Sequence, residues 1–192
     1  MLAIIITVFS VILDQLSKYF IVQTMELHTS KPFIPYVLSL YHTRNEGAAF
    51  SMLVDQRWVF MVVSTISMII IVWLLYKEYK RHPLLNVALS MVLGGGIGNM
   101  IDRVRLGYVV DFFHVDFVDF AVFNVADSFI TVGAILLIIY VIFFDAKVEA
   151  RIKAEKEALS AVCQTEDSAS ETTTEALPET EEAEKAEEAL DE

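Results

Sequence analysis

Hydrophobic residues are gathered into four long runs along this chain, and shorter polar stretches separate the runs. The runs cover about residues 2–25, 57–76, 84–101 and 123–144. About 20 apolar residues in a helix span the hydrocarbon core of a bilayer, which is about 30 Å thick. Because each run has about this length, the pattern predicts an all-α membrane protein with four transmembrane helices.

Two charged residues, Asp14 and Lys18, interrupt the first run. They lie four residues apart with the acid first, which is the favourable order for an ion pair on one face of a helix. An ionised side chain at membrane depth costs a few kcal/mol, so it is usually paired or functional. We therefore interpret Asp14 and Lys18 as a structural intramembrane pair that faces the other helices.

The stretch between the first two runs, residues 26–56, is polar and aromatic and contains Pro32 and Pro35. Aromatic, aliphatic and hydroxyl residues alternate through residues 36–53, which is typical of short strands. We expect a small β-rich segment between the first and second helices, at the membrane surface.

Basic residues orient the four helices. Three lie between residues 77 and 81, and four lie between residues 147 and 156. Short loops rich in Lys and Arg remain on the cytoplasmic side. This predicts that both termini are cytoplasmic and that residues 26–56 and 102–122 lie on the extracytoplasmic side.

Composition supports the membrane assignment and shows that the C-terminal 36 residues differ from the rest of the chain. The chain is 55% hydrophobic with a mean hydropathy of +0.53, which excludes an ordinary soluble domain. The whole net charge of −12 comes from residues 157–192, which hold 13 acidic residues and one basic residue. We expect a membrane domain over residues 1–156, followed by an acidic, disordered cytoplasmic tail. The single cysteine, Cys163, lies in this tail, which excludes a disulfide or a cysteine-ligated metal within the membrane domain.

Polar residues that suggest chemistry are concentrated between residues 94 and 128, where the third helix ends and the fourth begins. They are Asn99, Arg103, Asp111, Asn124 and Asp127. Two carboxyls held close together in a low dielectric do not both ionise readily, so such a pair keeps a proton between its members. This is the arrangement of an aspartic protease, which needs no cofactor.

Spacing alone leaves other pairings and other functions open. Asp102, Asp116 and Asp119 lie in the same connection and are alternative partners in an acid pair. His114 with Asp116 suggests a metal site only weakly, so we expect no metal. Intramembrane charges also occur in small transporters and channel components, and an assembly subunit without catalysis is a third possibility.

Five segments of the chain, in matching order, resemble the prolipoprotein signal peptidase family, also called signal peptidase II, a family of intramembrane aspartic peptidases. The segments are LDQLSKYF (13–20), RNEGAAFS (44–51), GGGIGNMIDR (94–103), GYVVDFF (107–113) and FNVADSFITVG (123–133). They extend from the first predicted helix to the fourth.

This resemblance implies an aspartic endopeptidase that cuts just before a diacylglyceryl-modified cysteine, at the extracytoplasmic face of the bacterial inner membrane. It implies a catalytic dyad of Asp111 and Asp127. Asn45, Asn99, Arg103 and Asn124 would orient the dyad or the substrate. The implied partners are lipid-modified prolipoproteins and membrane lipids, and we expect a monomer without cofactor, metal or nucleic acid.

Overall fold

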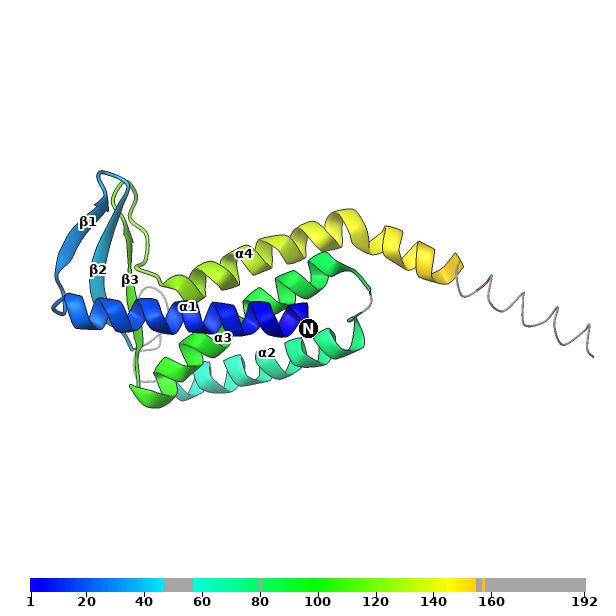
Figure 1. Ribbon diagram of the computed structural model, residues 1–192, viewed down its shortest axis with the longest axis horizontal. Helices are drawn as coiled ribbons and strands as arrows, with labels where there is room; N and C mark the ends of the chain where they lie inside the picture. The colour runs from blue at the N-terminus through cyan, green and yellow to red at the C-terminus, as the bar shows by residue number, and fades with distance from the viewer. Residues whose placement is uncertain (47–56, 80, 155–156, 158–192) are drawn as a thin grey trace, which may run out of the picture. The chain divides into compact units, whose positions relative to one another are not determined.

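The structure is a computed structural model that describes residues 1–46, 57–79, 81–154 and 157. Within these residues the chain is mostly helical and carries one small sheet (Figure 1). The elements are α1 (Leu2–Thr24), β1 (Ser30–Ile34), β2 (Leu38–Asn45), α2 (Arg57–Lys77), α3 (Pro83–Arg105), β3 (Val109–Val115), α4 (Val125–Tyr140) and the π-helix η2 (Val141–Asp145). All of them belong to one compact unit, Met1–Asp145, and a second unit comprises Ala146–Glu192.

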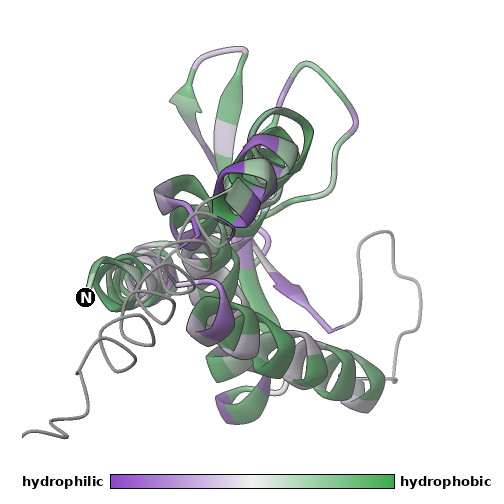
Figure 2. Cartoon of the chain, turned by 90° about the vertical axis from the view of Figure 1, so that its right-hand side faces the viewer, coloured by the Kyte–Doolittle hydropathy of each residue, from purple (hydrophilic) through white to green (hydrophobic). Residues whose placement is uncertain are grey.

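Four helices in the described residues are long and apolar enough to cross a membrane, which confirms that part of the prediction. Their ranges are Leu2–Thr24, Trp58–Lys77, Pro83–Arg105 and Val125–Ala154. Hydrophobic residues make up most of these helices (Figure 2), and many large apolar side chains of α1, α2 and α4 are exposed. Exposed apolar side chains of this number are stable in the hydrocarbon core of a bilayer, where no water surrounds them. The side of the membrane that each loop faces remains a prediction.

Helix α3 forms the centre of the bundle and packs against α1, α2 and α4. Glycines permit this close approach. A Cβ atom on Gly98 would lie 2.5 Å from Asp14 Oδ2 of α1, and one on Gly95 would collide with the carbonyl oxygen of Ala126 in α4. The glycine-rich run therefore serves helix packing, as its place in an apolar helix indicates.

The ends of two helices differ from the predicted spans. Helix α3 continues past residue 101 to Arg105, so Asp102 lies inside the helix and not in the following loop. Asp102 is 3% exposed, and its burial is possible because neighbouring groups satisfy the carboxylate. Helix α4 begins at Val125, and Asn124 is its N-cap rather than a residue of the helix.

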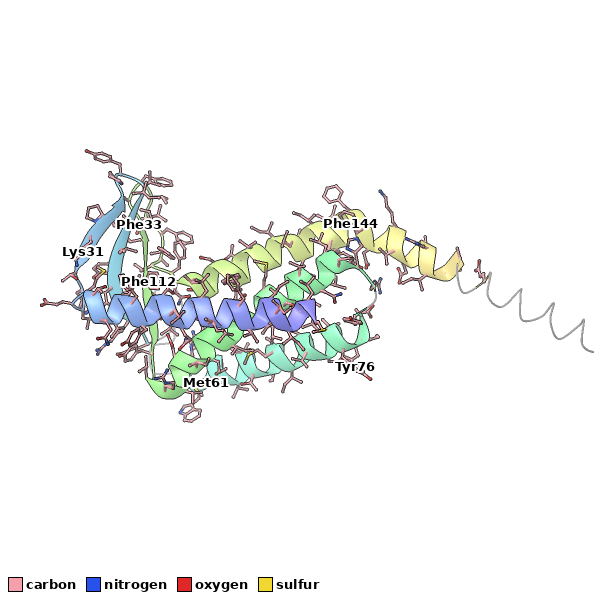
Figure 3. The ribbon with its side chains drawn as sticks, viewed as in Figure 1. Lys31, Phe33, Met61, Tyr76, Phe112 and Phe144 are labelled. Atoms are coloured by element: carbon pink, nitrogen blue, oxygen red, sulfur yellow. The ribbon has the colours of Figure 1, made fainter. Side chains whose placement is uncertain are left out.

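The sheet is antiparallel with the strand order β1-β2-β3. The first two strands lie between α1 and α2 as predicted, but β3 comes from the connection between α3 and α4, which was expected to be a loop. Phe112 of β3 packs against Ile21 of α1 and against Met25, the C-cap residue of α1, so the sheet is fastened to one end of the bundle (Figure 3). The third strand is the one that carries Asp111.

Candidate active site

Asp111 is held on β3 by the register of the sheet. It lies opposite Thr43 of β2. Alternate residues of a strand share one face, so Asn45 lies on the same face as Thr43, one step along. Asn45 Nδ2 donates a hydrogen bond to Asp111 Oδ2 at 2.9 Å. Asp111 is 2% exposed, and sheet pairing fixes both its position and one of its hydrogen-bond partners.

The start of α4 is brought beside β3 by a backbone bridge. Phe113 N donates to Phe123 O at 2.7 Å, and Phe123 N donates back to Phe113 O at 3.1 Å. Asn124 follows directly and caps the helix. The side-chain nitrogen Nδ2 of Asn124 donates to Asp111 Oδ1 at 2.7 Å. A residue that begins one helix thus reaches the carboxyl of a neighbouring strand.

Asp127 belongs to the first turn of α4 and forms a reciprocal cap with Asn124. Asp127 N donates to Asn124 Oδ1 at 2.9 Å, and Asn124 N donates to Asp127 Oδ2 at 3.1 Å. This is a capping box, which satisfies backbone N–H groups that a helix start otherwise leaves unpaired. The two aspartates therefore share Asn124 as a neighbour.

Asn99 of α3 joins the pair from the other side. Its Nδ2 donates to Asp127 Oδ1 at 2.8 Å. Its Oδ1 accepts from Asn124 Nδ2 at 3.1 Å and from Lys18 Nζ at 3.0 Å. Three asparagines, from β2, α3 and the start of α4, thus point N–H donors at two carboxyls.

A buried cluster of charges lies behind Asn99. Lys18 Nζ is 2.9 Å from Asp14 Oδ2 and 3.1 Å from Asp102 Oδ2. The predicted pair of Asp14 and Lys18 is therefore formed, and Asp102 joins it. Asp14 Oδ1 also accepts a hydrogen bond from Ala126 N at 3.0 Å, so the pair is tied to the first turn of α4.

A cavity of about 500 Å³ opens beside the two aspartates. Its lining residues are Asn45, Arg103, Asp111, Phe120, Ala121, Val122, Phe123, Asp127, Ser128, Thr131 and Val132. Six of these residues, the two aspartates included, are polar or charged, and the other five are apolar. A cavity of this size and lining is suited to an apolar chain that presents one polar group to the carboxyls.

The surroundings of Asp111 favour its protonated form. The pKa of Asp111 is raised from 3.8 to about 6. Burial is the largest cause and the charge of Asp127 adds to it, whereas the hydrogen bonds from Asn45 and Asn124 lower the pKa. At neutral pH a carboxyl with such a pKa exchanges its proton readily. The site is therefore suited to general acid and base chemistry.

The structure brings together the residues singled out from the sequence. Asn45, Asn99 and Asn124 each donate to one of the carboxyls, and Arg103 lines the cavity and donates to Asn99 O at 3.5 Å. Of the segment 44–51, residues 47–51 lie outside the described residues. Of the acidic tail, only Glu157 is described, and Cys163 lies outside.

The sequence did not reveal the contacts that two polar residues make near the site. Asp102 was regarded only as an alternative acid, and Gln15 was not considered. Gln15 Nε2 donates to Asp102 Oδ1 at 3.1 Å. The position of Gln15 next to Asp14 in an apolar run was a usable signal, because an amide at membrane depth also needs a partner.

The weaker alternatives place their residues elsewhere. Asp116 accepts from Ser39 Oγ at 2.9 Å and lies 3.3 Å from His114 Nδ1, at the sheet and away from the cavity lining. Asp119 is exposed. Throughout the described ranges, no three His, Cys, Asp or Glu side chains lie close enough together to hold a metal ion.

Comparisons with known proteins agree on one family. The family model for signal peptidase (SPase) II matches residues 6–143. Lipoprotein signal peptidases of Streptococcus pyogenes serotype M5 (strain Manfredo) and serotype M3 (strain SSI-1) are each 53% identical over 133 residues, which is 67% of this chain and 85% of each relative. Two solved structures, described as a bacterial membrane enzyme at 2.3 Å and at 1.9 Å resolution, are 39% identical with TM-scores of 0.70 and 0.69. The matches cover 73% and 74% of this chain, and 87% and 93% of those chains.

Proposed function

Because this chain belongs to the signal peptidase II family, we propose that it cleaves bacterial prolipoproteins just before their diacylglyceryl-modified cysteine, with Asp111 and Asp127 as the catalytic dyad. The family membership makes the chain a peptidase and sets aside the transporter and assembly-subunit readings. One observation carries the proposal of the dyad. Asn124 donates to both carboxyls, through its side chain to Asp111 and through its backbone N–H to Asp127, and both aspartates line the same cavity.

The reaction needs one carboxyl as an acid and one as a base. We assign the proton of the reactive form to Asp111, whose pKa is raised to about 6. The ionised Asp127 takes a proton from a water molecule as the water oxygen attacks the scissile carbonyl carbon. Asp111 gives its proton to the carbonyl oxygen, which forms a neutral tetrahedral diol.

Collapse of the diol completes the cleavage. The C–N bond breaks, Asp127 returns its proton to the leaving nitrogen, and Asp111 recovers a proton from a diol hydroxyl. The products are the carboxyl end of the signal peptide and the free amino group of the lipidated cysteine. The dyad thus finishes in its starting protonation state, and the reaction consumes one water molecule and no cofactor.

The neighbouring polar residues keep the dyad in place. Asn99 and the backbone of Asn124 donate to Asp127 and fix its orientation. Asn45 and Asn124 fix the orientation of Asp111. Arg103 lines the cavity at the end of α3, where it is suited to bind a peptide carbonyl of the substrate.

The substrate and the protein share the bilayer. A signal peptide is an apolar helix and a diacylglyceryl group stays among lipid chains, so a site at the end of a membrane-spanning bundle meets both. Three basic residues lie between α2 and α3, and four follow α4. Segments rich in Lys and Arg stay in the cytoplasm, which favours the extracytoplasmic side for the end of the bundle that carries the site. We propose that the enzyme works there as a monomer in contact with membrane lipids.

The proposal is tested by cleavage of a lipid-modified precursor by the purified protein in detergent, followed as a shift in size. Asp111→Asn and Asp127→Asn should each abolish cleavage while the protein remains folded. Asp116→Asn is the matched control, because Asp116 lies in the same connection but does not line the cavity. Precursor without the diacylglyceryl group should not be cut. Full activity in either dyad variant would remove the dyad from the mechanism.

A further inference from the structure

Two buried charged residues, Lys18 and Asp102, lie behind the proposed dyad and do not belong to the described cavity lining. Each is 3% exposed, and they form an ion pair of 3.1 Å. A buried ion pair is weak evidence of stability, because the cost of removing two charges from water offsets their attraction. Their hydrogen bonds to the groups around the site suggest a different purpose.

Lys18 determines which way the Asn99 amide points. An ammonium group donates hydrogen bonds and accepts none. The Asn99 atom facing Lys18 Nζ at 3.0 Å must therefore be the oxygen, which leaves the NH₂ group of the same amide to face Asp127 Oδ1 at 2.8 Å. If the amide were reversed, its oxygen would oppose the oxygen of Asp127. Lys18 thus acts on Asp127 through one intervening side chain.

Asp102 acts on the other carboxyl through the backbone. Its Oδ2 accepts a hydrogen bond from Val110 N at 3.1 Å, and Val110 directly precedes Asp111. The bond joins the last turn of α3 to strand β3. Gln15 Nε2 donates to Asp102 Oδ1 at 3.1 Å, which keeps the carboxylate from rotating away. These bonds fix the position of Asp111 relative to the end of α3.

We propose that Lys18 and Asp102 are positioning residues for the two carboxyls of the dyad. Lys18 orients Asp127 through Asn99, and Asp102 places Asp111 through the backbone of Val110. Because Lys18 and Asp102 form an ion pair, these two sets of contacts are linked, and together they fix the position of one carboxyl relative to the other. This inference rests on the proposed function, since it assigns a purpose to residues that do not touch the substrate.

The experiment must avoid leaving one charge buried without a partner, since that alone destabilises a protein strongly. The triple variant Asp14→Asn, Lys18→Gln and Asp102→Asn removes all three charges of the buried cluster, so that none is left without a partner. A second variant, Asp102→Glu, keeps every charge but moves the carboxylate by one methylene relative to Val110 N. Ser90→Ala is the control, because it removes a buried polar group between α1 and α3 far along the bundle from the dyad.

Each variant is purified in detergent, and its Tm, its kcat per folded molecule and its KM for lipid-modified precursor are measured. We expect kcat to fall at least about tenfold in both cluster variants with KM within about twofold, because a displaced dyad loses transition-state contacts and not substrate binding. Ser90→Ala should lower the Tm without changing kcat. Wild-type kcat in a folded Asp102→Glu or triple variant overturns the inference, as does an equal loss of kcat in Ser90→Ala. If instead the dyad variants themselves cleave precursor, it is the proposed function that fails.

Discussion

Asn124 and Asp127 cap each other at the start of α4, with the Asn124 side chain accepting from Asp127 N at 2.9 Å and the Asp127 side chain accepting from Asn124 N at 3.1 Å. Asp127, which caps the start of the helix, also lines the cavity. Because the helix start and the proposed chemistry depend on the same residues, substitutions at Asn124 should affect both stability and turnover.

Asn124→Ala removes both the cap and the donor to Asp111. Loss of an N-cap costs about 1 kcal/mol of stability. A hydrogen bond to a charged group contributes about 1.5–3 kcal/mol, so turnover should fall about tenfold to hundredfold, less than in the dyad variants. Asn124→Ser separates the effects, because serine caps a helix well but lacks the amide nitrogen. Its Tm should approach the wild-type value while its turnover stays low, and restored turnover would remove Asn124 from the mechanism.

The stability of the protein should depend on pH through Asp111. Its pKa is about 6 in the folded state, above the ordinary value of 3.8. Between about pH 4 and pH 6 the folded state keeps a proton that the unfolded chain releases, so this contribution to stability is present at low pH and is lost as the pH rises. Asp111→Asn has no group to titrate there. The Tm of the wild type minus that of Asp111→Asn should decrease across this window, and parallel curves would contradict the raised pKa.

The glycines of α3 offer a matched pair of packing variants. A Cβ atom at Gly95 would collide with the backbone oxygen of Ala126, which cannot move without displacing α4. A Cβ atom at Gly96 would lie 3.5 Å from Met68, an ordinary contact with a flexible side chain. Gly95→Ala should lower the Tm and the activity together, because α4 carries Asp127, whereas Gly96→Ala should leave both near the wild-type values. Equal tolerance of the two would show that α3 and α4 are packed less closely.

Chelation should leave the reaction unaffected. A carboxylate dyad activates water without a metal ion, so cleavage of lipid-modified precursor should proceed at the same rate in excess EDTA. Loss of cleavage that added zinc restores would instead indicate a metallopeptidase, for which His114 and Asp116 were the weak signal in the sequence.

The hydrophobic pattern was sufficient for the helices, because a membrane span requires a fixed length of apolar residues whatever its neighbours are. It was less accurate at the ends. Asp102 and Arg103 looked like the start of a loop because they are charged, yet α3 continues through them to Arg105. Partners from other elements make this possible, and a linear pattern does not contain them.

The third strand was missed for a related reason. Residues 109–115 are apolar and aromatic enough for a strand, but a strand forms only against a partner, and β2 is separated from β3 by two whole helices. The sequence therefore placed Asp111 only in the connection between the third and fourth helices. The register that sets it opposite Thr43, within reach of Asn45, is a property of the assembled sheet.

By itself, the sequence determined the four long apolar helices, the separation of an acidic tail from the apolar part, and the residues Asn45, Asn99, Arg103, Asp111, Asn124 and Asp127 as the candidates for chemistry. These follow from composition and from short motifs, which are local. Only the tertiary structure decided that Asn124 is a cap joined to both carboxyls and that Lys18 meets Asp102 behind them. Hydrogen bonds and ion pairs act over about 3 Å, so residues far apart in the chain acquire these partners only when the helices pack.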